Sequence, residues 1–324
     1  MEQLSLIRKP IETELSKYKQ LFDSSLQSST PMLTDVLSHI RNRRGKMMRP
    51  ILVLLAARNW GRVTDGSYES AVSLELLHTA SLVHDDIVDE SDERRGQPSV
   101  NAVYNNKVAV LVGDYMLSTS LLHAANTLDS RVVRTVSDLG IALSSGEILQ
   151  LSNVQNPDFS YDVYYDIIRH KTAALFAACS KIGAITSGAS DDDVEKARLF
   201  GETVGICFQI RDDIFDYFDD SNIGKPTGND MREGKLTLPV LYALNSTGNA
   251  EIQAIARRVK QHDVTADEVA RLVEFTKQNG GIEYAEKMME EFRQKALELL
   301  SDSPEGEIKD ALLAYIEYVV KRNM

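Results

Sequence analysis

The chain has 324 residues, of which 43% are hydrophobic and 26% charged, and its formal net charge is -12. This composition excludes a disordered chain, because the apolar fraction is large enough to fill a core. The negative charge excludes binding to nucleic acid through a basic face.

The sequence has the organisation of one helical domain. No proline-, glycine- or serine-rich linker and no repeat divides it, so we predict a single domain over residues 1–324. Apolar residues recur at helical spacing almost throughout, and no alternating strand pattern competes with them. The predicted fold is all-α, a single-domain antiparallel helical bundle around a central apolar cavity.

The first motif along the chain is the basic segment Gly-Lys-Met-Met-Arg-Pro at residues 45–50. Lys46 and Arg49 are three residues apart, which predicts that they lie on one side of a helical turn and grip a diphosphate together. Taken alone this signal is weak, since basic turns are commonly solvated.

A predicted helix over residues 68–90 ends in an acidic cluster. Asp85 and Asp89 are four residues apart, so both carboxylates project from one face, and Asp86 lies between them. Acids at the negative end of a helix dipole repel one another, which favours a bound cation. His78, two turns before Asp85, is expected to face the same cavity.

The next segment, residues 108–125, is the most apolar of the chain. It is interrupted by Gly113 and carries Asp114, so we expect a buried core helix and no transmembrane span. Cys179 and Cys207 each lie in an apolar run, which predicts two buried free thiols and a cytoplasmic protein.

A second acidic cluster repeats the first. Asp212 and Asp216 are again four residues apart at the end of an apolar helix, with Asp213 between them and Gln209 one turn before Asp213. Oxygen ligands without cysteine or histidine indicate Mg²⁺, which prefers to share its coordination with phosphates. We infer a diphosphate bridged between the two clusters by Mg²⁺. Either cluster alone is as readily explained as a solvated helix end.

Basic side chains accompany both clusters. Arg94 and Arg95 follow the first, while Lys225 and Lys235 follow the second in two Gly-Lys motifs. Further along, a capping box and an apolar stripe predict helices over about residues 266–278 and 282–299.

The ordered set G-K-x-x-R-P, D-D-x-x-D with R-R, K-T, Q-x-x-D-D-x-x-D and G-K resembles the motifs of the trans-isoprenyl diphosphate synthases, in particular long-chain, octaprenyl-like members. The resemblance extends from Gly45 to Pro239, and the K-T pair is Lys171 and Thr172. Each motif is weak alone, but the set is specific. Met47 stands where the family commonly has arginine.

The resemblance implies an isoprenoid synthase fold, a homodimer and the head-to-tail condensation of isopentenyl diphosphate onto an allylic diphosphate. It implies that isopentenyl diphosphate is held by Lys46, Arg49, His78 and Arg95. It implies that the allylic diphosphate is held by Arg94, Lys171, Thr172, Gln209, Lys225 and Lys235. Mg²⁺ is expected on Asp85, Asp89, Asp212 and Asp216, with Asp86 and Asp213 as supports. The residues expected to carry catalysis are Asp85, Asp86, Asp89, Arg94, Lys171, Asp212 and Lys225.

Product length is expected to depend on Ala80 and Ser81, one turn before the first cluster. Both are small where short-chain members of the family tend to carry aromatic stops, so we predict seven to ten isoprene units, C35 to C50, with C40 as the central value for quinone side chains. Small residues also simply allow close helix packing.

Three alternatives remain: a short-chain farnesyl or geranylgeranyl diphosphate synthase, a class I terpene cyclase, and a noncatalytic subunit of a heteromeric prenyltransferase. The second acidic cluster disfavours the cyclase, and both clusters being intact disfavours the noncatalytic subunit. We expect no stable membrane anchor, although a long apolar product suggests transient membrane contact during its release.

Overall fold

The computed structural model describes residues 2–41, 45–94, 96–153, 158–218 and 227–321. These residues are almost entirely helical. Their only strands are β1 (Glu93–Arg94) and β2 (Gln97–Pro98), which pair antiparallel in a short hairpin. The predicted all-α class is confirmed.

The chain divides into two compact units. The first consists of Met1–Ile141, Leu175–Gly201 and Asp302–Ala314, and the second of Ala142–Ala174, Glu202–Ser301 and Tyr315–Met324. Four helices contribute residues to both units: α8 (Ser130–Ser152), α10 (Ala174–Ser187), α11 (Asp191–Phe215) and α17 (Glu307–Lys321). The single domain therefore stays a prediction.

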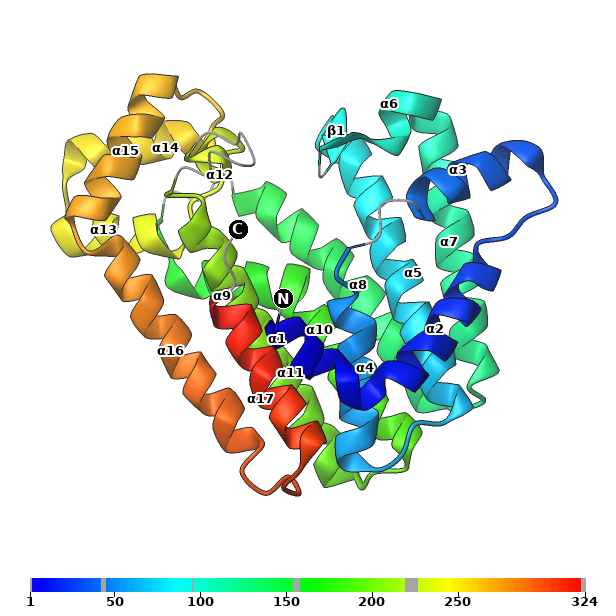
Figure 1. Cartoon of the computed structure of the whole chain (residues 1–324). Helices are drawn as coiled ribbons and strands as arrows, with labels where there is room; N and C mark the ends of the chain where they lie inside the picture. Colours follow the sequence, from blue (N-terminus) through cyan, green and yellow to red (C-terminus); the bar gives the residue numbers. More distant parts are fainter. Residues whose placement is uncertain (1, 42–44, 95, 154–157, 219–226, 322–324) are drawn as a thin grey trace. The chain divides into compact units, whose positions relative to one another are not determined.

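Figure 1 shows α1 to α7 of the first unit in blue to teal, with α5 and α7 side by side. Its remaining helices are α1 (Glu2–Arg8), η1 (Lys9–Ile11), α2 (Glu12–Ser25), α3 (Pro31–Arg41), α4 (Met48–Trp60), α5 (Asp65–Val88), α6 (Val100–Tyr104) and α7 (Asn106–Asn126). The second unit holds α9 (Tyr161–Ile168), the π-helical segment η3 (Arg169–Ala173), α12 (Asn229–Arg232), α13 (Leu238–Thr247), α14 (Ala250–Lys260), α15 (Ala266–Gln278) and α16 (Gly281–Leu299).

Helices α5 and α7 pack closely through small polar residues. The Ser73 hydroxyl donates to the Ser120 carbonyl oxygen at 2.8 Å, and the Ser120 hydroxyl donates to the Ser73 carbonyl oxygen at 2.7 Å. Both residues are buried, so this reciprocal pair satisfies polar groups that burial would otherwise leave at a cost. The contact fixes α5, the helix that carries the first acidic cluster.

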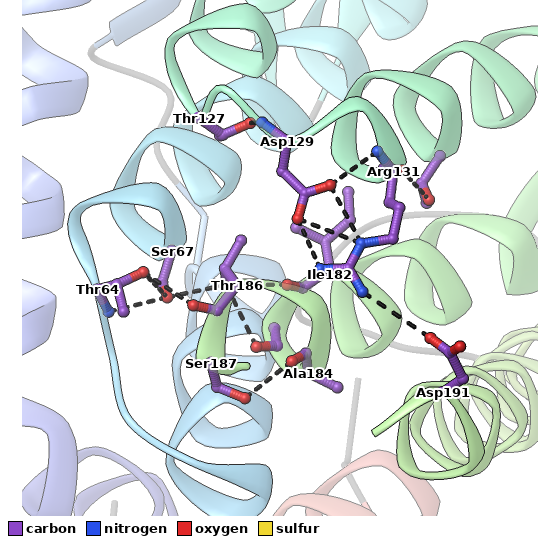
Figure 2. Close-up of polar contacts among 12 residues, drawn as sticks. Thr64, Ser67, Thr127, Asp129, Arg131, Ile182, Ala184, Thr186, Ser187 and Asp191 are labelled. Carbon is purple, nitrogen blue, oxygen red and sulfur yellow. Dashed lines mark hydrogen bonds and ion pairs between the residues drawn. The ribbon is translucent and has the colours of Figure 1, made fainter. Parts of the chain in front are cut away.

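The amino-terminal end of α5 is held by a second polar contact (Figure 2). Thr64 and Ser67 form a capping box, in which the Thr64 backbone N–H donates to Ser67 Oγ at 3.1 Å. Ser67 Oγ also lies 2.9 Å from Thr186 Oγ1, and the Thr64 hydroxyl donates to the Thr186 carbonyl oxygen at 3.0 Å. The start of α5 is thereby tied to the end of α10, within the first unit.

Other local predictions hold. Thr265 and Glu268 form the expected capping box at the start of α15, and Cys179 and Cys207 are buried free thiols. The predicted helix over residues 282–299 is α16.

Helix α7 departs from the expected buried core helix. By length and composition alone it could cross a membrane, and it is the one such helix within the described part of the chain. Only 39% of its most apolar stretch is buried. Val110, Leu111, Leu121 and Leu122 are exposed. The sequence pattern could not separate the face that packs on α5 from this exposed one, because both faces are apolar.

Candidate active site

The first acidic cluster lies at the carboxyl end of α5. Asp85 is half-buried, and Asp89, which is exposed, is the residue at which the helix ends. The Asp89 backbone N–H donates to the Asp85 carbonyl oxygen at 2.8 Å, which holds the two residues one turn apart. Both carboxylates are thus accessible to a cation.

Asp86 has a different environment from its neighbours. It is 2% exposed, and its Oδ1 accepts a hydrogen bond from Arg94 Nε at 2.5 Å. A buried carboxylate needs such a partner, and removing either member leaves an uncompensated charge. Arg94, which the resemblance assigns to the allylic diphosphate, therefore also fixes the β1–β2 hairpin to the end of α5.

His84 packs against a glycine on the neighbouring helix. Its Nε2 lies 3.3 Å from the Val110 carbonyl oxygen and 3.6 Å from Asp114 Oδ1. A Cβ on Gly113 would lie 2.1 Å from His84 Nε2, so only glycine leaves room for the ring. Gly113 thus lets α7 approach the residue that immediately precedes Asp85.

The predicted geometry of the basic segment is wrong. Lys46 is not on the same helical turn as Arg49, because α4 begins at Met48 and Met47 has a left-handed backbone with φ of 54°. Pro50 is tolerated only in the first turn of a helix, which fixes where α4 begins. Lys46 is exposed in the preceding loop, and Arg49 is half-buried.

Two residues that sequence reasoning missed support this basic segment. Arg8 Nη2 in α1 donates to the Lys46 carbonyl oxygen at 2.8 Å, and Arg49 Nη1 lies 4.0 Å from Glu75 Oε2 on α5. Each contact joins segments far apart in the sequence, so no local pattern indicates it.

A pocket opens beside these groups in the first unit. Its charged or polar lining includes Arg49, Glu75, His78, Asp86 and Arg94, and its apolar lining includes Tyr18, Phe22, Ile40, Leu82, Val83 and Val100. His78 was expected to share a cavity with Asp85. The acidic residues among the described lining residues are Glu75 and Asp86 instead.

Neither of the two predicted chain-length residues is among the described lining residues of this cavity. Ala80 is fully buried at 0% exposure. Ser81 is half-buried, and its hydroxyl donates to the His78 carbonyl oxygen at 2.9 Å.

The second acidic cluster lies at the carboxyl end of α11. Asp212 and Asp216 are half-buried. Asp216 Oδ1 accepts from the Asn229 backbone N–H at 2.9 Å, and Oδ2 accepts from the Asp230 backbone N–H at 3.1 Å. Burial raises the pKa of Asp216 above its ordinary value, and these two hydrogen bonds partly oppose that shift.

Asp213 is the buried member of this cluster, at 1% exposure. Its Oδ2 accepts from the Tyr164 hydroxyl at 2.6 Å, and its Oδ1 accepts from Gln209 Nε2 at 2.8 Å. Gln209 Oε1 in turn accepts from the Thr172 hydroxyl at 2.7 Å. Burial raises the pKa of Asp213 to about 7, although both of its hydrogen bonds act to lower it. Gln209 was predicted beside this cluster, whereas Tyr164 was not.

Lys171 and Thr172 lie in the π-helical segment η3. Lys171 Nζ donates to Glu147 Oε2 at 2.6 Å and to Gln150 Oε1 at 3.3 Å. A Cβ on Gly146 would lie 2.8 Å from His170 Cβ, so α8 packs directly against the bulged segment. Single-turn π-helices are frequent at functional sites, and this one turns both predicted ligands toward α8 and α11.

A pocket in the second unit brings these groups together. The predicted residues Lys171, Thr172, Gln209 and Lys235 all line it, as do Tyr164, Asp213, Asp230 and the unpredicted Lys260. Burial raises the pKa of Asp230 well above its ordinary value and lowers that of Lys260. Lys225 and Arg95 lie outside the described residues.

The carboxylates fit Mg²⁺ as paired ligands. Within the described residues no three histidine, cysteine or acidic side chains converge into a ready metal cage. Mg²⁺ is usually bound by one or two carboxylates and completes its shell with water and substrate phosphates. The pairs Asp85/Asp89 and Asp212/Asp216 supply donors of that kind, while the buried carboxylates Asp86 and Asp213 already accept hydrogen bonds from Arg94 and Tyr164.

Comparison with known proteins identifies the family. The polyprenyl synthetase family matches residues 30–276. The chain belongs to the polyprenyl synthetase family. It is 33% identical over 318 residues to the octaprenyl diphosphate synthase of Haemophilus influenzae, covering 98% of this chain and 96% of that relative.

Two solved structures are similar over nearly their whole length. A geranylgeranyl pyrophosphate synthase from Bacteroides thetaiotaomicron is 54% identical with a TM-score of 0.88, covering 99% of this chain and 100% of that one. A polyprenyl synthase from Caulobacter crescentus, complexed with calcium and isoprenyl diphosphate, is 29% identical with a TM-score of 0.91, covering 98% of both chains. This polyprenyl synthetase is therefore a prenyltransferase with the isoprenoid synthase fold, and its substrates are isopentenyl and allylic diphosphates.

The raised pKa of Asp213 predicts a pH-dependent stability. Because the folded pKa of about 7 exceeds the unfolded value of about 4, Asp213 favours the folded state at low pH, and this contribution is lost as the pH rises from about 4 to 7. In a metal chelator, the thermal midpoint of the wild type should fall more between pH 5 and pH 8 than that of Asp213→Asn. Equal slopes would contradict the buried, ionising carboxyl.

Proposed function

We propose that this polyprenyl synthetase makes a long all-trans polyprenyl diphosphate, of C35 to C50 with C40 as the central value, for quinone side chains. The observation that carries the proposal is the end-to-end similarity to an octaprenyl diphosphate synthase, with both acidic clusters intact in this chain.

Each of the two cavities binds one of the two substrates. In the first unit, Lys46, Arg49 and His78 hold isopentenyl diphosphate, and in the second, Lys171, Thr172, Gln209 and Lys235 hold the allylic diphosphate. Lys46 is not among the described lining residues, and we include it because its neighbours Met47 and Arg49 line the cavity. Arg95 and Lys225 keep their predicted roles, in the isopentenyl and allylic sites respectively.

The reaction needs no nucleophilic side chain. The C–O bond of the allylic diphosphate breaks, and the diphosphate leaves with the electron pair. The double bond of isopentenyl diphosphate attacks the allylic cation, a new C–C bond forms, and the resulting cation loses a proton to restore a double bond. Lys171 and Lys235 place positive charge where the departing diphosphate becomes more negative, and such preorganised charges commonly supply the largest catalytic effect.

Mg²⁺ is the proposed cofactor, on Asp85, Asp89, Asp212 and Asp216. When bound, it supplies charge neutralisation to the diphosphate leaving group. The similar Caulobacter crescentus polyprenyl synthase was solved with calcium, which supports a divalent ion in this family. Paired oxygen ligands that leave coordination positions open to phosphate favour Mg²⁺ over a metal that requires a complete protein cage.

A C20 product is the second candidate. The 54% identical Bacteroides thetaiotaomicron structure is of a geranylgeranyl pyrophosphate synthase, a short-chain activity. Incubating the purified chain with farnesyl diphosphate, radiolabelled isopentenyl diphosphate and Mg²⁺, followed by chromatography, separates the candidates. Products of C35 to C50 support the proposal, a C20 product replaces it with the second candidate, and no extension by the chain alone favours a noncatalytic subunit.

Replacing Ala80 with phenylalanine should shorten the product. The aromatic ring would stop elongation one turn before the first acidic cluster, so chromatography should show loss of the C35–C50 products in favour of shorter ones. Because Ala80 is fully buried, the ring also overpacks the core at a cost of about 1–3 kcal/mol. Ser81→Phe, at a half-buried position, is the second variant, and unchanged product length in both would refute the proposed path.

We further propose a homodimer formed through the exposed apolar face of α7, with a second copy as the occupant. Leu111 is 67% exposed, Val110 is exposed next to it, and Leu121 and Leu122 are exposed about three turns further along the same helix. Contiguous exposed apolar side chains mark interaction surfaces. Light scattering should give the mass of a dimer for the wild type and of a monomer for Leu111→Glu. A monomeric wild type that binds vesicles through this face would overturn the proposal.

We also propose that the enzyme acts in the cytoplasm, where its two buried free thiols stay reduced. We expect it to contact a membrane transiently when it releases its product.

A further inference from the structure

A chain of three short hydrogen bonds joins four residues of the second unit at the predicted allylic site. It runs from the Tyr164 hydroxyl to Asp213 at 2.6 Å, from Gln209 Nε2 to Asp213 at 2.8 Å, and from the Thr172 hydroxyl to Gln209 Oε1 at 2.7 Å. The four residues come from three elements, α9, η3 and α11. All four line the cavity that also holds Lys171 and Lys235.

The donors and acceptors of this chain fix one another. When ionised, Asp213 accepts from both sides, so Gln209 presents its NH₂ group to Asp213 and its carbonyl oxygen to Thr172. A flipped amide would set its oxygen against the Asp213 oxygen, which is also an acceptor. The hydrogen of the Thr172 hydroxyl is thereby directed at Gln209, and one N–H of Gln209 remains for another acceptor.

Tyr164 is the buried end of the chain. It is buried in α9, and its hydroxyl stays protonated because burial raises its pKa well above the ordinary value, with Asp213 adding to the shift. Without this donor, the buried Oδ2 of Asp213 would lose a charge-assisted hydrogen bond, which is typically stronger than a neutral one. Asp213 could then rotate and release the Gln209 amide.

We propose that Tyr164 is a positioning residue for the allylic diphosphate, acting through Asp213 to hold Gln209 and Thr172 in the orientation that receives it. The inference rests on the proposed function of this cavity. It adds to that function a residue that acts on the diphosphate through Asp213 and Gln209. This residue lies on the helix that leads directly into the π-helical segment.

The adjacent residue offers a matched control. The Tyr165 hydroxyl is also buried, but it has no hydrogen-bond partner within the part of the chain that the structure describes. Tyr164→Phe and Tyr165→Phe therefore remove the same atom from neighbouring positions of one helix. Only the first of these substitutions cuts the chain to Asp213.

Steady-state kinetics with separate titrations of the two substrates provides the test. Tyr164→Phe should raise KM for farnesyl diphosphate about tenfold, the effect of about one lost hydrogen bond to a charged group. KM for isopentenyl diphosphate should stay within about twofold, because none of its predicted ligands belongs to this chain of hydrogen bonds. Tyr165→Phe should match the wild type in both, and Tyr164→Phe/Asp213→Asn should be no worse than Asp213→Asn alone.

Equal KM values for Tyr164→Phe and Tyr165→Phe, or equal rises for both substrates, would overturn the inference. If Tyr164→Phe does not fold, as judged by its thermal midpoint, Asp213→Asn tests the same link and must raise KM for farnesyl diphosphate alone. A wild type that makes no extended product would instead refute the proposed function, so the two failures are distinguishable.

Discussion

Replacing Asp85 with asparagine is expected to slow chain extension about 100- to 1000-fold while leaving the protein folded. The substitution removes one of the two accessible charges that attract a divalent cation to the end of α5. It should not lower stability, because Asp85 and Asp89 are like charges at the negative end of a helix. Incorporation of labelled isopentenyl diphosphate and the thermal midpoint measure the two effects separately.

Asp192→Asn is the matched control for this substitution. Asp192 is an exposed acid in the first turn of α11 and belongs to neither acidic cluster. Its replacement should leave the extension rate within about twofold of the wild type, as for most surface substitutions. Comparable losses in Asp85→Asn and Asp192→Asn would mean that total negative charge, rather than the cluster, governs activity.

Gly113→Ala is expected to destabilise the protein by about 1–3 kcal/mol and to lower activity with it. The added Cβ would lie 2.1 Å from His84 Nε2, so the ring must leave its place beside the Val110 carbonyl oxygen. Because His84 directly precedes Asp85, its displacement disturbs the first acidic cluster. Thermal unfolding and the extension rate report the two consequences.

Gly140→Ala provides the opposite expectation within another helix. A Cβ on Gly140 in α8 meets no atom within 4 Å. Gly140→Ala should therefore raise the free energy of unfolding by up to about 1 kcal/mol, because alanine has a higher helix propensity. If Gly113→Ala proved as stable as Gly140→Ala, the close approach of α7 to His84 would not be what requires glycine.

The sequence predicted those features that depend on local spacing. The helix that ends at the first cluster, the buried thiols and the Thr265 capping box follow from periodicity and from residue types a few positions apart. The contact of Gln209 with Asp213 was likewise predictable, because residues four apart on a helix are neighbours.

Other features of the site depend on contacts between distant segments. The π-helical turn at Lys171 coincides with the close packing of Gly146, and the left-handed Met47 is followed by a helix start that Pro50 constrains. The hydrogen bond from Tyr164 to Asp213 joins residues 49 positions apart. Each is set by tertiary packing, which overrides the local pattern that a single sequence displays.

Binding of a farnesyl thiolodiphosphate, whose C–S bond resists ionisation, tests most directly whether the acidic clusters bind the allylic diphosphate through Mg²⁺. Calorimetric titration should show tight binding to the wild type with Mg²⁺, and about tenfold or greater weakening in Asp85→Asn and in Asp212→Asn alike. In a chelator, all three proteins should bind equally weakly. Undiminished affinity in either variant, or wild-type affinity that does not respond to removal of Mg²⁺, would contradict the account.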